Sequence, residues 1–467
     1  MNRQTTPPVT RQITRELEEQ ILSGELQEGA RLYSVRNIAE RYGVSIAVGL
    51  AAYRALEKKG LVVREAGRGT FVRPRPDSSD HGLRVYSWSG IFSLNPVQAL
   101  LAELAEQLNV QKYEFHPFYT AQYENYDEYI QWLQMANESG RKPPDLVSVD
   151  EGLLPVMVER NLLLPLNDLL ERSTELAVKD FPEKLLRGMT YKGKIYSLPI
   201  TYSPTVLFYN RDLFLAEKLP EPDSDWSWSD LSEAVLRMTQ ITPSGQIARY
   251  GLGVVFSVNA FAPFIFQNGG ELIDRNGSCA INTDEAIEGL NFFSKLYQLP
   301  GVCSHKFGDP RRALADLLAN GLLAMLIGDA QDYYVLKDAM QGKQWGMVRI
   351  PGHSNNHATC ISMQGWGIGS SSAHPEDAFK FMTKLYKDEN LHRFCRFSDK
   401  LPACRAENHD VPPLFREAVK DGMFALPSSS INAFRGIHST ITTALSHRIS
   451  LTREKCLEFQ KKINAML

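Results

Sequence analysis

A polar segment near the start of this chain divides it into two unequal parts, and this division constrains the fold more than any other sequence feature. Residues 73–82 read Arg-Pro-Arg-Pro-Asp-Ser-Ser-Asp-His-Gly and show neither helical nor strand periodicity, which is typical of a linker. The 467 residues also exceed what one ordinary core organises. We therefore expect a small unit over residues 1–75, a linker over 76–82 and a large unit over 83–467.

The two parts differ in charge. Residues 1–75 hold 11 Arg and 2 Lys against 8 Glu and no Asp, whereas the whole chain has a net charge of -3. A basic head on an acidic body is expected where only the head meets nucleic acid. The opening residues lack the apolar core of a signal peptide, no stretch approaches the roughly 20 apolar residues of a membrane span, and the six cysteines are scattered. We expect a cytoplasmic protein with reduced thiols and no membrane contact.

Three helical patterns precede a hairpin pattern in the head. Apolar residues recur every four positions from Ile13 to Ile21, and Ser34 and Ser45 are good N-caps for two further short helices. Residues 61–72 place β-favouring segments on both sides of a glycine-rich tip. This order predicts a winged helix-turn-helix unit, which offers the start of its last helix to the major groove of DNA.

The large unit begins with an alternation of strand and helix patterns. Strands are predicted over residues 83–88 and 145–150, and helices over 96–108, 126–139 and 153–160. Alternation of this kind predicts an α/β body with mainly parallel sheets.

Five phrases of the head resemble the GntR-type winged helix-turn-helix regulators, and they occur in the family's order. The phrases are Ile-Leu-Ser-Gly (21–24), Gly-Ala-Arg-Leu-Tyr-Ser-Val-Arg (29–36), Tyr-Gly-Val-Ser (42–45), Leu-Glu-Lys-Lys-Gly-Leu (56–61) and Gly-Arg-Gly-Thr-Phe-Val (67–72). The resemblance covers the whole head and implies that it binds double-stranded operator DNA.

The resemblance also implies which residues approach DNA. Arg36 and the wing segment 67–70, at the tip of the predicted hairpin, match the family pattern. Ile46 and Leu50, however, stand where the family usually has two arginines. At these two positions no arginine can form two hydrogen bonds with the edge of a base. Sequence specificity must therefore come from Ser45, from Ala47, from contact of Ile46 with a thymine methyl group, or from DNA shape. The candidate DNA-binding residues are Arg36, Ser45, Ile46, Ala47, Arg54, Arg64, Gly67, Arg68, Gly69 and Thr70.

Nine phrases of the large unit resemble the family 1 extracellular solute-binding proteins of sugar ABC transporters. They are Lys-Pro-Pro-Asp-Leu-Val (142–147), Leu-Pro-Leu (164–166), Tyr-Lys-Gly-Lys-Ile-Tyr-Ser-Leu-Pro (191–199), Leu-Phe-Tyr-Asn-Arg-Asp-Leu-Phe (207–214), the segment 226–231, Asn-Gly-Gly (268–270), Gly-Leu-Leu-Ala-Met (321–325), Ile-Pro-Gly (350–352) and Ala-Phe-Lys-Phe (378–381). The resemblance implies a periplasmic-binding-protein-like fold of type II, with two α/β lobes and a solute between them. We expect the chain to cross between the lobes near residues 200–206, 360–367 and 424–434.

Residues that bind the solute should lie at strand ends or crossings. Proteins bind sugars by packing flat aromatic side chains against the sugar ring, and by hydrogen bonds from carboxylate, amide and guanidinium groups to the sugar hydroxyls. At each single position, core packing or helix capping is the alternative interpretation. The candidates are Trp88, Ser89, Asp150, Glu151, Tyr202, Asp329, Tyr333, Trp366 and Arg435.

Together the two resemblances imply a ligand-responsive transcription regulator that acts as a homodimer, with a mono- or oligosaccharide as its effector. Two alternatives stay open: a sugar-binding receptor with a vestigial DNA-binding head, and a pyridoxal-phosphate-dependent fusion enzyme, although the body has no recognisable context for a cofactor lysine. The chain has no familiar catalytic motif. His353 and His357 lie in a segment that predicts a turn rather than a metal-binding helix. We expect neither metal nor cofactor.

Overall fold

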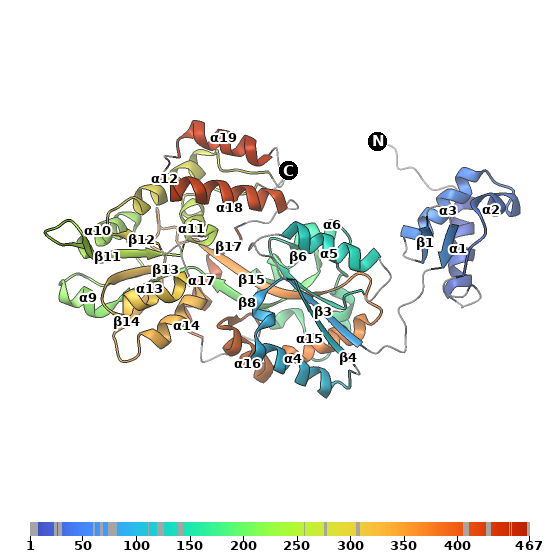
Figure 1. Cartoon of the computed structure of the whole chain (residues 1–467), viewed down its shortest axis with the longest axis horizontal. Coiled ribbons are helices and arrows are strands. Elements are labelled where there is room, and N and C mark those ends of the chain that lie inside the picture. The colour runs from blue at the N-terminus through green and yellow to red at the C-terminus, as the bar shows by residue number, and fades with distance from the viewer. Residues whose placement is uncertain are drawn as a thin grey trace. The chain divides into compact units, whose positions relative to one another are not determined.

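The computed structural model describes residues 8–22, 26, 30–58, 61–65, 69–72, 82–110, 112–118, 126–138, 143–255, 257–274, 278–304, 309–404, 411–425, 431–447, 449 and 451–464 (Figure 1). The chain divides into two compact units. One comprises Met1–Gly82 with Met135–Pro143, and the other Leu83–Gln134 with Pro144–Leu467. Each is described by itself, as head and body.

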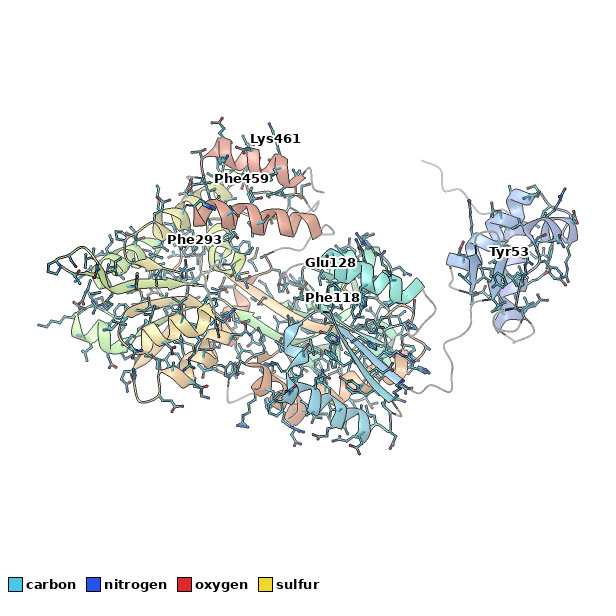
Figure 2. The ribbon with its side chains drawn as sticks, in the orientation of Figure 1. Tyr53, Phe118, Glu128, Phe293, Phe459 and Lys461 are labelled. Atoms are coloured by element: carbon cyan, nitrogen blue, oxygen red, sulfur yellow. The ribbon has the colours of Figure 1, made fainter. Side chains whose placement is uncertain are left out.

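The head is a three-helix unit closed by a hairpin. Its elements are α1 (Pro8–Leu22), α2 (Val35–Arg41), α3 (Ile46–Lys58), β1 (Val62–Glu65) and β2 (Gly69–Val72). The strands β1 and β2 pair antiparallel, and α3 packs on both α1 and α2. Apolar stripes of all three helices form one core around Tyr53, which is fully buried (Figure 2). The predicted winged helix-turn-helix is confirmed.

Local sequence signals set the turn between α2 and α3. The Ser34 hydroxyl accepts a hydrogen bond from the Asn37 amide at 3.1 Å, which caps α2. Gly43 has φ +62°, a left-handed conformation that glycine adopts without strain. The Tyr42 hydroxyl donates to Glu16 on α1 at 2.7 Å. These contacts cap α2, tie its end to α1 and set the turn that leads into α3.

The first lobe of the body is built on a seven-stranded sheet in the order β16-β8-β15-β5-β3-β4, with β17 beside β15. Its core includes the apolar faces of α4, α15 and α16. The elements are β3 (Gly82–Ser87), η1 (Gly90–Ser93), α4 (Asn95–Gln107), β4 (Lys112–Pro117), α5 (Tyr126–Glu138), β5 (Leu146–Asp150), α6 (Leu154–Glu159), α7 (Asn167–Arg172), η2 (Val178–Asp180), α8 (Glu183–Gly188), β6 (Thr190–Tyr191), β7 (Lys194–Ile195), β8 (Ser197–Pro204), β15 (Thr359–Ile368), α15 (Pro375–Leu385), α16 (Asp388–Ser398), β16 (Leu401–Pro402), α17 (Pro413–Lys420) and β17 (Gly422–Met423).

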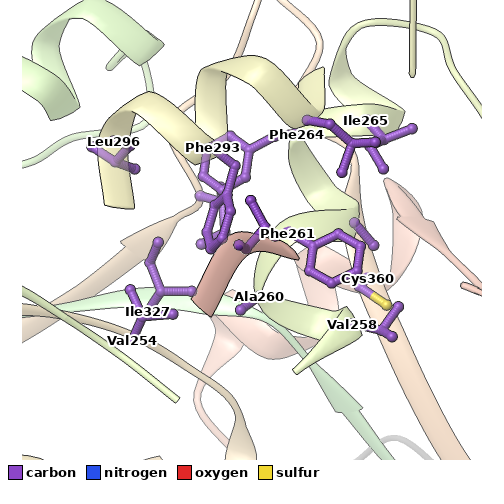
Figure 3. Close-up of a cluster of buried hydrophobic side chains, with 14 of the residues drawn as sticks. Val254, Val258, Ala260, Phe261, Phe264, Ile265, Phe293, Leu296, Ile327 and Cys360 are labelled. Atoms are coloured by element: carbon purple, nitrogen blue, oxygen red, sulfur yellow. The ribbon is translucent and has the colours of Figure 1, made fainter. Parts of the chain in front are cut away.

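The second lobe is built on a six-stranded sheet in the order β10-β11-β13-β9-β14, with β12 beside β11. Its core is rich in phenylalanine from α11 and α12, and the C-terminal helices α18 and α19 return to this lobe (Figures 1 and 3). The elements are β9 (Val206–Asn210), α9 (Arg211–Ala216), α10 (Trp228–Met238), β10 (Gln240–Ile241), β11 (Ile247–Val254), α11 (Val258–Gln267), α12 (Asp284–Tyr297), β12 (Val302–Cys303), α13 (Pro310–Ala319), β13 (Leu323–Gly328), α14 (Ala330–Ala339), β14 (Trp345–Arg349), α18 (Ile431–Ser446) and α19 (Arg453–Asn464).

The chain passes between the two sheets three times. The first passage is at Thr205, between β8 and β9. The second is at the start of β15, because Ala358 and Cys360 still belong to the second-lobe core and the strand pairs with β8 of the first sheet from Ile361 onward. The predicted segment 360–367 therefore begins at this passage, but most of it lies within the first sheet. The third follows β17 and ends before α18, and residues 426–430 of it lie outside the described residues.

The expectation of mainly parallel sheets is wrong, because both sheets are mixed. In the first, β15 runs antiparallel to β5 and β8; in the second, β9 runs antiparallel to β13 and β14. The strands on either side of the first two passages, β8, β9, β14 and β15, take part in all these antiparallel pairs. They leave or enter a sheet directly from the other lobe, without the helical crossover that makes neighbouring strands parallel.

Three predictions about caps and turns are confirmed. Ser227 and Asp230 form the capping box of α10, and Gly193 turns the hairpin of β6 and β7 with φ +78°. The segment from His353 to His357 is a turn, with a bridge between His353 and Asn356. All six cysteines are free thiols. Among the described helices, none is both long and apolar enough to cross a membrane.

Candidate functional site

The ends of β3 and β5 bring polar residues together in the first lobe. The Ser148 hydroxyl accepts a hydrogen bond from the Trp88 amide at 3.1 Å, and the Ser89 hydroxyl donates to Gln364 Oε1 at 3.0 Å. Gln364 pairs with Asp150 across β15 and β5. The predicted residues Trp88, Ser89 and Asp150 therefore share one edge with Gln364.

Glu151 connects this edge to the passage between the lobes. Its Oε2 accepts a hydrogen bond from the Met363 amide at 3.0 Å. Burial, together with the charge of Asp150, raises the pKa of Glu151 to about 8. The carboxyl group is therefore largely protonated at neutral pH, and it can donate a hydrogen bond as well as accept one.

The second lobe contributes a buried ion cluster at the N-terminus of α14. Arg311 binds Asp329 through two parallel hydrogen bonds of 2.9 and 3.0 Å, and it binds Asp332 at 2.5 Å. Asp329 also caps α14 by accepting from the Gln331 amide at 2.9 Å. The paired geometry is the strong form of an arginine–carboxylate contact.

The two carboxyl groups of the cluster differ in proton affinity. Burial raises the pKa of Asp332 to about 6, against the influence of Arg311. Burial also acts on Asp329, but Arg311 and Lys400 outweigh it and lower the pKa of that residue. A side chain at Gly328 would meet the Asp332 carboxylate at 2.5 Å, so the glycine makes room for the cluster.

Lys400, from the first lobe, faces this cluster of the second lobe. Burial lowers the pKa of Lys400, whereas Asp329 opposes the change. The Tyr334 hydroxyl on α14 donates to the Lys400 carbonyl at 3.3 Å. The lobes thus meet through α14 on one side and the turn before β16 on the other.

Hydrogen bonds join the lobes at the first two passages. Thr359 donates to the Thr205 carbonyl at 2.6 Å, and Ser203 Oγ accepts from the Ala330 amide at 2.9 Å. The Cys360 thiol donates to Asn259 on α11 at 3.2 Å. Burial raises the pKa of that thiol, and Glu151 and Asp329 raise it further. These two acidic residues, one from each lobe, therefore lie near the same crossing strand.

Three predicted ligand residues do not join this group. Trp366 is fully buried and stacks on Phe92 at 5.3 Å in the first-lobe core, so its assignment to the ligand is corrected: the strand position that suggested a crossing is a core position. Tyr202 lies on the opposite face of β8 from Ser203 and lines a separate cavity of ≈ 150 Å³ with Arg416. The third is Tyr333, which lies among Tyr334, Trp345 and Phe415. The side chain of the fourth candidate, Arg435, is outside the described residues, so its assignment stays a prediction.

The predicted DNA contacts of the head fall into two sets. Arg36, Ser45, Ile46, Ala47 and Arg54 are all exposed on α2, on α3 or in the turn between them. The side chains at the start of α3 are therefore exposed to solvent and accessible to DNA.

The wing is described only in part. Gly67 and Arg68 lie outside the described residues, as does the side chain of Arg64. Gly69 has φ +127°, and a side chain there would approach Arg31 Nε to 2.8 Å. Thr70 is 6% exposed, so its side chain packs inside the head and is removed from the candidate DNA surface.

Sequence reasoning missed Arg311, Asp332 and Lys400. Asp332 had a usable signal, because Asp329 and Asp332 form a capping box at the start of α14. Arg311 and Lys400 had none, since they reach the cluster only through the folding of distant segments. Within the described part of the chain, no group of three or more His, Cys, Asp or Glu side chains is placed to hold a metal ion.

A two-lobed α/β body with three passages and hydrogen-bonded lobes defines the class of bilobal solute-binding proteins. Comparison with known families agrees. Residues 96–391 match the family described as bacterial extracellular solute-binding protein, which covers more than half of the chain, and the chain belongs to this family. Residues 9–72 match the bacterial regulatory proteins of the gntR family, so the head is a GntR-type helix-turn-helix domain. Both predicted resemblances are confirmed.

Individual relatives match the two parts separately. The galactooligosaccharide-binding protein of Bacillus subtilis is 22% identical over 388 residues, which is 79% of this chain and 85% of the relative. Binding proteins of Brucella abortus and Brucella suis are 22% identical over 234 residues, 49% of this chain, and the match spans only 55% of their length. The HTH-type transcriptional repressor NagR of Bacillus subtilis is 38% identical over 88 residues, 19% of this chain and 36% of the repressor.

Solved structures match the body. An ABC substrate-binding protein from Listeria monocytogenes in complex with cycloalternan has a TM-score of 0.65 at 20% identity, covering 82% of this chain and 98% of that chain. A cyclo/maltodextrin-binding protein complexed with maltotetraose has a TM-score of 0.62 at 18% identity, covering 82% and 97%. These likenesses establish the fold, and they confirm the predicted fold class.

Proposed function

We propose that this protein is a ligand-responsive transcription regulator in which the head binds operator DNA and the body senses a carbohydrate. One observation carries the proposal: a single chain joins a GntR-type head, with an exposed third helix, to a solute-binding body with polar groups on both sides of its inter-lobe passage. Operator DNA lies in the cytoplasm, so the proposal places the protein there.

The effector binds between the lobes. Glu151 and Gln364 from the first lobe, and Asp329 from the second, supply the hydrogen-bonding groups that sugar hydroxyls require. Three of the relatives and solved structures named above carry saccharides in their names or titles, which supports this class of ligand. No enzyme activity is proposed, because both matched families are described by binding or regulation.

Ligand binding then changes operator affinity through lobe closure. A ligand that touches both lobes favours the closed arrangement, and a homodimer can convert this arrangement into a different spacing of its two heads. By linkage, operator DNA changes ligand affinity by the same factor as the ligand changes operator affinity.

A thermal-shift screen of the full chain against mono- and oligosaccharides tests the sensing role. Ligand at 100 times its Kd stabilises the folded state by about 2.7 kcal/mol, which raises the melting temperature. Arg311→Met and Glu151→Gln should weaken the shift, whereas Arg312→Met, on the neighbouring exposed position, should leave it unchanged. A screen in which no saccharide shifts the melting temperature would remove the carbohydrate assignment.

A receptor with a vestigial head is the second candidate, and the apolar residues Ile46 and Leu50 favour it. Salt-dependent retention of the full chain on duplex DNA distinguishes the two candidates. The regulator binds at low salt and is released at high salt; the receptor is not retained at either.

A further inference from the structure

The first two turns of α3 carry only apolar side chains, and several of these side chains are exposed. Ile46 is 56% exposed, Ala47 and Ala51 are exposed, and Leu50 is half-buried. Residues 46–52 read Ile-Ala-Val-Gly-Leu-Ala-Ala, so no side chain in these two turns carries a hydrogen-bond donor or acceptor. The first polar side chain on the N-terminal side is Ser45.

The fold of the head does not require Ile46. The inner face of α3 supplies Ala52, Tyr53 and Leu56 to the core, and Ile46 is not a member of that cluster. Gly49 lets α3 approach α2 closely, since a side chain there would lie 3.2 Å from the Val35 carbonyl. An exposed isoleucine beside such a tightly packed face is available to a partner.

The surrounding charge identifies that partner as a polyanion. The first 75 residues hold thirteen basic and eight acidic side chains. Arg54, which is exposed, lies on α3 with the apolar surface, and Arg36, whose side chain is 80% exposed and pairs with Glu40 at 3.9 Å, lies on the neighbouring helix α2. Exposed arginines suit the phosphate backbone on both sides of a groove, whereas an apolar surface suits the floor of the groove.

We infer that α3 reads the 5-methyl groups of thymine, so that the operator half-site is centred on A·T pairs. In the major groove every base pair presents donors or acceptors, but only thymine presents a methyl group. Side chains without polar atoms cannot pair with guanine O6 and N7, and they gain only from apolar contact. The inference rests on the proposed function and names what its DNA-binding surface recognises.

The test starts from a pool of random duplexes selected with the full chain. Binding of the selected duplex is then compared with that of the same duplex carrying deoxyuridine for thymine in the half-site. Removing one buried methyl should weaken binding about fourfold per contact. Ile46→Ala should bind both duplexes alike, and Ile46→Arg should move the selected sequence toward guanine. Leu236→Ala, at a position on α10 that is 52% exposed, is the matched control and should retain the difference.

The outcomes separate this inference from the function on which it rests. Salt-sensitive binding of a guanine-centred site, or equal binding of the thymine and deoxyuridine duplexes, overturns thymine reading and leaves the regulator intact. Failure to bind any duplex at low salt overturns both. Self-association of the full chain without DNA that Ile46→Ala abolishes would assign the surface to a second copy instead. Since Ile46 is outside the core, its variants should melt like the parent chain, which excludes misfolding as a cause.

Discussion

Glu151 is a carboxyl group that the fold keeps largely protonated near neutral pH. Its pKa in the folded chain, about 8, is above the ordinary value of a glutamate, because burial and Asp150 disfavour the charge. A raised pKa means that the folded state binds a proton which the unfolded state releases. The contribution of the protonated Glu151 side chain to the free energy of unfolding is therefore complete below about pH 4.5. It is lost as the pH rises through 8.

Glu151→Gln removes that dependence, because an amide keeps the hydrogen bond with the Met363 amide and does not titrate. We expect the variant to be more stable than the parent by about 1–3 kcal/mol at pH 8, and to differ little near pH 5. Chemical denaturation at several pH values measures this. Glu171→Gln, at an exposed position on α7, is the control. Parallel pH profiles for parent and variant would contradict the account.

Arg311 has a different role, since it neutralises two buried carboxyl groups at once. Arg311→Met removes the cation that is hydrogen-bonded to both Asp329 and Asp332, and we expect a loss of about 3–5 kcal/mol of unfolding free energy. Arg312 is adjacent and exposed, and it pairs with Asp316 one turn away, so Arg312→Met should cost less than about 1 kcal/mol. Equal losses for both variants, measured by urea unfolding, would show that the cluster is unimportant for stability.

At the scale of elements, the close contact of α11 and α12 depends on one glycine. A side chain at Gly289 would lie 2.5 Å from the Phe264 carbonyl, among the phenylalanines of the second-lobe core (Figure 3). We expect Gly289→Ala to destabilise the chain by about 1–3 kcal/mol, despite the better helix propensity of alanine. Gly90→Ala, where a side chain meets open space, is the control for the substitution. A more stable Gly289→Ala variant would refute this packing.

The positions of several helices and strands in the first lobe could be predicted from the sequence, but the direction of the strands could not. Periodicity and caps located β3, α4, α5, β5 and α6 to within one or two residues, because those signals are local. Strand direction was predicted wrongly, since it depends on which lobe a strand comes from. Asp329 and Glu151 follow strands and were predicted as ligand residues for that reason. Trp366 was misassigned, because the same apolar pattern serves a crossing strand and a core strand.

At the scale of the whole molecule, the proposed regulator is a homodimer in which each chain joins a carbohydrate sensor to a DNA reader. The proposed regulation depends on a coupling free energy between its two binding sites, and couplings of this type typically change affinity about 5- to 150-fold. This coupling needs no change of fold in either part. It requires only that the ligand prefers one of two arrangements of the lobes.

The most direct measurement is the affinity of the full chain for a selected operator duplex, with and without a saturating concentration of the saccharide found by thermal shift. The account predicts a change of at least about fivefold, which disappears in a variant that no longer binds the saccharide. Identical operator affinities in the presence and absence of saturating ligand would contradict it.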